Sequence, residues 1–140
     1  MPEQQSFDYA IVRVVPRVER GEFINAGVIL FSRTGRYLQA RIELDHRRLA
    51  ALAPDIDIIE VERQLNLIPL ICQGDPAGGP MAEEPPSARF HWLTAPRSTV
   101  IQTSPVHTGL CGDPEVMLEH LMETMVRAPL PLDPTLGAGA

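Results

Sequence analysis

Polar and charged residues recur at positions where a strand pattern does not require them. One arginine interrupts an apolar strand, two residues flank the start of the next apolar run, and the others surround a later β-branched segment. These candidate residues are Arg13, Arg20, Asn25, Arg97, Ser98, Gln102, Ser104 and His107. Guanidinium groups bind phosphate through paired hydrogen bonds, neutral side chains add donors, and histidine can transfer a proton near neutral pH. The pattern predicts an anion or nucleotide-phosphate pocket.

The same residues also allow a purely structural interpretation. Arg13 can pair with Glu22, and the remaining polar groups can complete turns and loops. Buried arginines are commonly paired for structural reasons. The two interpretations differ in geometry, because a pocket requires one set of side chains to come together in space. That set is Arg13, Asn25, Arg97 and His107.

Other site chemistries find less support in the sequence. His107, Cys111 and Asp113 are close together, but zinc sites usually take four ligands in recognisable pairs. Cys72 lies on an apolar stripe, which indicates an inert thiol, and Cys111 has no third residue to complete a catalytic set. The sequence contains neither a G-x-x-x-x-G-K nor a G-x-G-x-x-G phosphate loop. We therefore predict no bound metal and no cofactor.

Three strands are predicted to position these residues. Residues 7–15 and 24–32 are β-branched and apolar, and residues 37–44 alternate between apolar and polar, so the three form an antiparallel meander. Gly27 lies inside the central strand, where glycine is normally costly, so we expect another element to approach it closely. Residues 89–93 and 99–103 are further strand candidates.

Helices are predicted between and after these strands. Asp45 can cap a helix that Pro54 ends, and Asp57 with Glu60 resembles a capping box at the start of a longer helix. Pro69 should kink or break that longer helix. The last helix begins at Asp113-Pro114. The fold class is therefore α+β, with an antiparallel sheet of about four strands packed mainly on one face by two or three helices.

Length and composition indicate one small intracellular domain. We predict a single α+β domain over residues 1–128, with a loop or linker at residues 74–88, and a flexible tail over residues 129–140. A formal net charge of -6 argues against broad nucleic-acid binding. No stretch reaches the apolar length of a membrane span, and the first residues lack a secretory signal. We predict a cytoplasmic protein without membrane contact, and the sequence leaves self-association open.

Two blocks of the sequence resemble a known family. Residues 9–30 read YAIVRVVPRVERGEFINAGVIL, which contains R-x-V-P, then R-G-E, then N-x-G-V. Residues 96–109, PRSTVIQTSPVHTG, form the second block, and Asp113-Pro114 follows it. Over roughly residues 7–126 the chain resembles a bacterial family of small uncharacterised proteins, classified as a domain of unknown function. Members are often encoded beside HipA-like serine/threonine kinases, so the resemblance implies a kinase partner and assigns no catalytic residue.

Two functions remain as hypotheses. The first is a non-catalytic binding or accessory partner of a HipA-like kinase. The alternative is a small phosphoester- or nucleotide-handling enzyme built on Arg13, Arg97 and His107. An enzyme should gather these residues in a concave pocket, whereas an accessory protein should present an exposed apolar patch or sheet edge.

Overall fold

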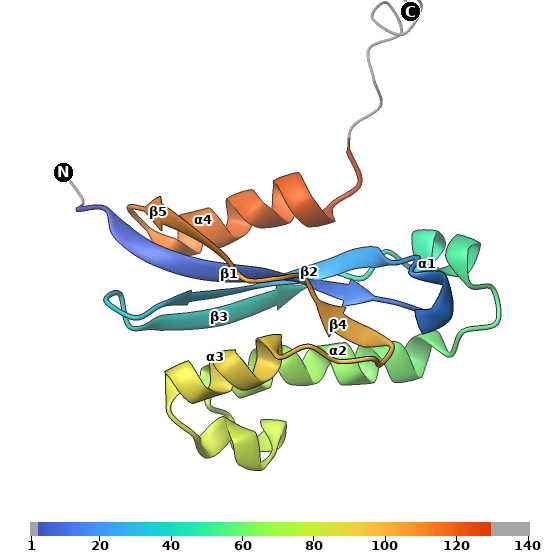
Figure 1. Ribbon diagram of the computed structural model, residues 1–140, viewed down its shortest axis with the longest axis horizontal. Coiled ribbons are helices and arrows are strands. Elements are labelled where there is room, and N and C mark those ends of the chain that lie inside the picture. The colour runs from blue at the N-terminus through green and yellow to red at the C-terminus, as the bar shows by residue number, and fades with distance from the viewer. Residues whose placement is uncertain (1–2, 130–140) are drawn as a thin grey trace, which may run out of the picture.

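A five-stranded antiparallel sheet lies at the centre of the computed structural model, which describes residues 3–129 (Figure 1). Strand β3 (Tyr37–Ile42) pairs with β2 (Ile24–Ser32), and β2 pairs with β1 (Gln5–Val14). The other side of β1 pairs with two short strands in succession, β4 (Ile101–Thr103) and β5 (His107–Cys111). The sheet therefore has two free sides, one along β3 and one along β4 and β5.

Helices cover both faces of this sheet (Figure 1). One face packs against α2 (Ile58–Gln73) and α3 (Pro86–Thr94), with α1 (His46–Leu52) at its margin. The opposite face packs against α4 (Pro114–Leu121), which continues into the π-helical turn η4 (Met122–Val126). None of the helices within residues 3–129 is long and apolar enough to cross a membrane.

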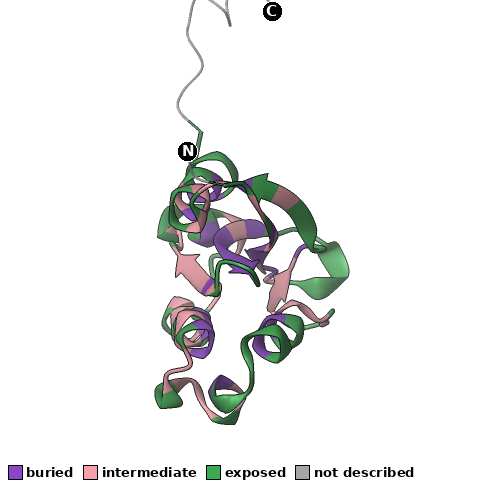
Figure 2. Ribbon diagram, turned by 90° about the vertical axis from the view of Figure 1, so that its left-hand side faces the viewer, coloured by how far each residue is buried: buried purple, intermediate pink, exposed green. Residues whose placement is uncertain are grey.

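The α+β class is confirmed, with α2 and α3 on one face of the sheet and α4 on the other. The physical reason lies in β1 and β2, which are apolar on both sides. Val12 and Val14 face α2, while the alternating residues Phe7 and Ile11 face α4. A strand that is apolar on both sides must be covered on both sides. Figure 2 shows the result, with buried residues concentrated in the strands and on the inward faces of the helices.

The predicted helix starts are confirmed by their caps. Asp45 accepts a hydrogen bond from the Arg48 amide at 3.0 Å, and Asp57 accepts one from the Glu60 amide at 3.1 Å. The side chain of Asp113 accepts from the amide two residues later at 2.9 Å. The predicted break at Pro69 is wrong, because α2 runs through it without interruption. Burial of the helix face on either side of Pro69 outweighs the loss of one backbone hydrogen bond.

Two further expectations are corrected in the second half of the chain. Residues 89–93 belong to helix α3 and not to a strand. Their buried residues, Phe90 and Leu93, follow a helical spacing, and Pro86 at the first helical position favours a helix start. Strand β5 was not predicted. The expected strand at residues 99–103 is present as the three residues of β4.

The segment expected to be a linker has local structure of its own. It contains the 3-10 turns η2 (Pro76–Gly78) and η3 (Pro80–Glu83) and then the first residues of α3. Asp75 accepts a hydrogen bond from the Ala77 amide at 2.9 Å, which fixes the first turn. Apart from its first residue, Pro129, the expected tail lies outside the described residues.

Candidate functional site

Three of the predicted site residues are neighbours in the sheet. Arg13 on β1 lies opposite Asn25 on β2, and on its other side it lies opposite Gln102 on β4. A β-bulge precedes this point, because Val12 pairs with Gly27 and leaves one β2 residue without a partner. The guanidinium of Arg13 lies 4.2 Å from the centroid of the Phe23 ring. Arg13 and Asn25 thus meet at one end of the sheet, as the antiparallel order predicts.

Hydrogen bonding in this group is incomplete. The amide nitrogen of Asn25 donates to the Met125 carbonyl at 2.8 Å, and that of Gln102 donates to the Thr99 carbonyl at 2.8 Å. Within the described residues, Arg13 Nε and Asn25 Oδ1 are buried without a hydrogen-bond partner. Arg13 also forms no ion pair with Glu22. This part of the structural interpretation is wrong, since Glu22 is bound elsewhere.

Glu22 pairs with Arg20 on the exposed loop that joins β1 to β2. The hydrogen bond from Arg20 and its positive charge lower the pKa of the Glu22 carboxyl. Arg20 therefore already has a carboxylate partner. An exposed pair of this kind contributes little to stability.

The other predicted residues lie apart from Arg13. Arg97 donates to the Leu93 carbonyl at 3.0 Å and to the Trp92 carbonyl at 2.5 Å, so it caps the end of α3 on the α2 side of the sheet. Ser98 is exposed in the following loop. His107 pairs with Tyr9, four residues along β1 from Arg13, which is a separation of about 13 Å. The expected meeting of Arg13, Asn25, Arg97 and His107 is therefore corrected.

Ser104 has a structural role at the junction between β4 and β5. It is buried, and its hydroxyl oxygen accepts a hydrogen bond from the Ile11 amide at 2.8 Å. The Ser104 amide in turn donates to the Ile11 carbonyl at 2.8 Å. These two bonds hold the irregular stretch between the two short strands against β1.

A second cluster, which the sequence did not reveal, lies beside β3. The turn between β2 and β3, the end of α2 and the start of α3 enclose a cavity of about 660 Å³. Arg33, Arg36 and Arg89 line it, and its described lining contains no aspartate or glutamate. Arg33 and Arg36 lie in the turn between β2 and β3, and Pro86 is the first residue of α3, but nothing in their spacing predicts that these segments meet.

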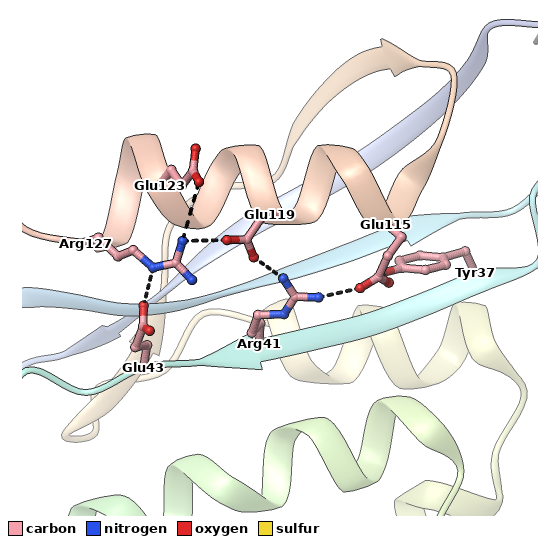
Figure 3. A network of polar contacts seen from close by, with 7 residues as sticks. All are labelled: Tyr37, Arg41, Glu43, Glu115, Glu119, Glu123 and Arg127. Atoms are coloured by element: carbon pink, nitrogen blue, oxygen red, sulfur yellow. Dashed lines mark hydrogen bonds and ion pairs between the residues drawn. The ribbon is translucent and has the colours of Figure 1, made fainter.

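A network of charged side chains fastens α4 to β3 (Figure 3). Arg41 on β3 binds Glu115 and Glu119 of α4. Arg127 binds Glu43 at 2.7 Å and Glu119 at 2.6 Å. The hydrogen bond from Arg127 is the main reason why the pKa of Glu119 is lowered. Every cation here has a carboxylate partner, so the network is structural.

The two cysteines are poor candidates for nucleophiles. Burial raises the pKa of the Cys72 thiol to about 12. Burial, followed by the nearby Asp113 carboxylate, also raises the pKa of Cys111. Raised pKa values oppose formation of the reactive thiolate. Within residues 3–129, no group of three histidine, cysteine or acidic side chains is placed to hold a metal ion.

Comparison with known proteins gives one match. A protein-family model described as "Protein of unknown function (DUF3037)" matches residues 9–126. No curated protein matches the chain, and no solved structure matches it.

Proposed function

We propose that this chain, which belongs to the DUF3037 family of proteins of unknown function, is a non-catalytic binding protein that pairs the free edge of β5 with a strand of a partner protein. The observation that carries the proposal is the composition of that edge. β5 hydrogen-bonds to β1 on one side, and no strand of the described chain lies on its other side. A strand with unpaired backbone groups is a template for pairing with another chain.

The side chains of β5 support this role. Its odd-numbered residues face α4, as shown by Cys111 in the α4 core and by His107 against the Tyr9 ring. Leu110 therefore points to the opposite face, where 64% of it is exposed. Val106, just before the strand, is 44% exposed. An incoming strand would cover these apolar side chains as it pairs with the backbone.

The opposite edge of the sheet has a different character. β3 carries Arg41, which is engaged with two glutamates of α4, and Arg36 and Glu43 flank the strand. Charged side chains on an edge strand discourage pairing with other chains. β5 contains no aspartate, glutamate, lysine or arginine. This contrast selects β5 as the docking edge.

The partner that we propose is a HipA-like serine/threonine kinase of a bacterial host. This assignment rests on the resemblance of residues 9–30 and 96–109 to a family whose genes often neighbour those of such kinases. Binding is favoured over catalysis because Arg13, Arg97 and His107, on which an enzyme was expected to be built, are separated in space. Binding in the cytoplasm is part of the same proposal.

Leu110→Glu should abolish the complex with the kinase. The charge would be placed on the strand face that the incoming strand covers, where its desolvation is costly. Leu110 is mostly exposed, so the free protein should keep its fold. The measurement is co-expression of the tagged chain with the neighbouring HipA-like kinase, followed by affinity purification and size-exclusion chromatography.

Ile59→Glu is the matched control, because Ile59 is 82% exposed on α2 and its replacement introduces the same charge far from β5. It should leave a stoichiometric complex intact. The proposal fails if no complex forms at low or moderate salt, or if Leu110→Glu and Ile59→Glu behave alike. It also fails if the wild-type chain instead forms a homodimer that Leu110→Glu disrupts.

A further inference from the structure

The cavity beside β3 carries an inference that is independent of the β5 edge, because it lies at the opposite side of the sheet. Three arginines line it: Arg33 and Arg36 from the turn between β2 and β3, and Arg89 from α3. The acidic residues nearest in sequence to its lining are Asp75, Glu83 and Glu84, and none of them is part of that lining. The cavity is therefore strongly cationic within a chain whose net charge is -6.

Arg89 is the buried member of the three. It is only 9% exposed, and its Nη1 donates to the carbonyls of Ile71 at 2.9 Å and Cys72 at 2.8 Å, at the end of α2. Its Nε is buried and has no hydrogen-bond partner among the described residues. No carboxylate of the described chain neutralises this guanidinium. A buried charge without a counter-ion is costly, and an anion in the adjoining cavity would lower that cost.

The start of α3 adds donors to the same cavity. Its N-cap residue, Pro85, offers no side-chain hydrogen bond, and Pro86 and Ser87 line the cavity. Within the described residues, the backbone amide of Ser87, which lines the cavity, has no hydrogen-bond partner, and neither has that of Ala88, the next residue, which lies outside the lining. Free amides at a helix N-terminus, together with the helix dipole, favour a bound anion.

We propose that this cavity binds the phosphate group of a small organic phosphomonoester. A phosphomonoester near pH 7 carries a charge of about −1.5 to −2 and three acceptor oxygens, which suits three guanidinium groups and the Ser87 amide better than a singly charged carboxylate does. The cavity volume of about 660 Å³ is far larger than a phosphate ion, and Phe31, Leu38 and Pro86 supply apolar walls. The rest of the ligand is therefore an apolar or aromatic group.

The test is an NMR titration of the full chain with three probes: phenyl phosphate, inorganic phosphate and benzoate. Phenyl phosphate should bind most tightly and should shift the backbone amides of Ser87, Ala88 and Arg36. Its affinity should fall as salt is added, because the attraction is largely electrostatic. If benzoate binds as tightly, the site does not select phosphate, and if inorganic phosphate does, the organic group makes no contact. Either result, or the absence of saturable shifts at these amides, overturns the proposal.

Variants of Arg33 and Arg36, the two exposed arginines of the cavity, provide a second test of the proposal. The double variant Arg33→Gln/Arg36→Gln should weaken phenyl phosphate binding by about tenfold or more, because two charge-assisted contacts are lost. The matched control is Arg47→Gln/Arg63→Gln, which removes the same charge from α1 and α2, away from the cavity lining. This control should stay within about twofold of the wild type. Equal losses in the two double variants would show a general charge effect and would contradict a site at this cavity.

Discussion

Replacing Gly27 with valine should lower the free energy of unfolding by about 3 kcal/mol. A Cβ at position 27 would lie 2.5 Å from the Arg41 carbonyl oxygen and 2.6 Å from Ile42 Cδ1. The expectation of a close approach is thus confirmed, and the approaching element is the neighbouring strand β3. Because one contact is to backbone, the strain cannot be relieved by a side-chain rotation. Urea denaturation followed by circular dichroism measures the change.

The control for this substitution is Gly21→Asn. Gly21 has a φ of 70°, and a Cβ added there would meet no atom within 4 Å, so space is available for a side chain. Asparagine tolerates the left-handed region, and the expected cost is below about 1 kcal/mol. If Gly27→Val is as mild as Gly21→Asn, the register of β2 and β3 differs from the one described.

Arg89→Met should also destabilise the fold, by about 2 kcal/mol. Methionine keeps much of the volume but removes the Arg89 donor from the carbonyls of Ile71 and Cys72 at the end of α2, of which Ile71 keeps a hydrogen bond from the Gly74 amide. Buried acceptors that lose a partner account for the cost. Thermal and urea unfolding of the purified variant give the measurement.

Arg63→Met is the matched control for Arg89→Met. Arg63 is an exposed residue of α2 that pairs with Glu60, and exposed pairs contribute about 0–1 kcal/mol. If the Arg89→Met variant proves as stable as the Arg63→Met variant, then Arg89 does not fasten the start of α3 to the end of α2.

Much of the fold could be predicted because its signals are local. The alternation of residues 37–44 marks β3, and Asp45, Asp57 and Asp113 each cap the helix that follows them. That residues 89–93 form part of a helix could not be predicted in the same way, since a short apolar run suits a strand or a helix equally. The sequence does not reveal β5 because Gly109 is unfavourable in a strand, and because the pairing with β1 depends on residues about 100 positions away.

The candidate site was harder to predict, for a physical reason. Arg13 and Asn25 belong to consecutive antiparallel strands, so their proximity follows from the chain order. Arg97 and His107 flank β4 at opposite ends and could meet only if the chain turned back at Pro105, but it leads directly into β5. The cavity beside β3 forms where the turn between β2 and β3, the end of α2 and the start of α3 meet. Such contacts are set by packing on the α2 face of the sheet.

The most direct test of the account is hydrogen exchange at the backbone amides of β5, measured by NMR for the free chain and for the chain mixed with a HipA-like kinase, the proposed partner. Amides of β5 that do not bond to β1 should exchange markedly more slowly in the complex, because a strand of the kinase would accept their hydrogen bonds. Amides of β3 should be unchanged. Slowed exchange confined to β3 or to the helices, with β5 unaffected, would contradict the proposal that β5 is the docking edge.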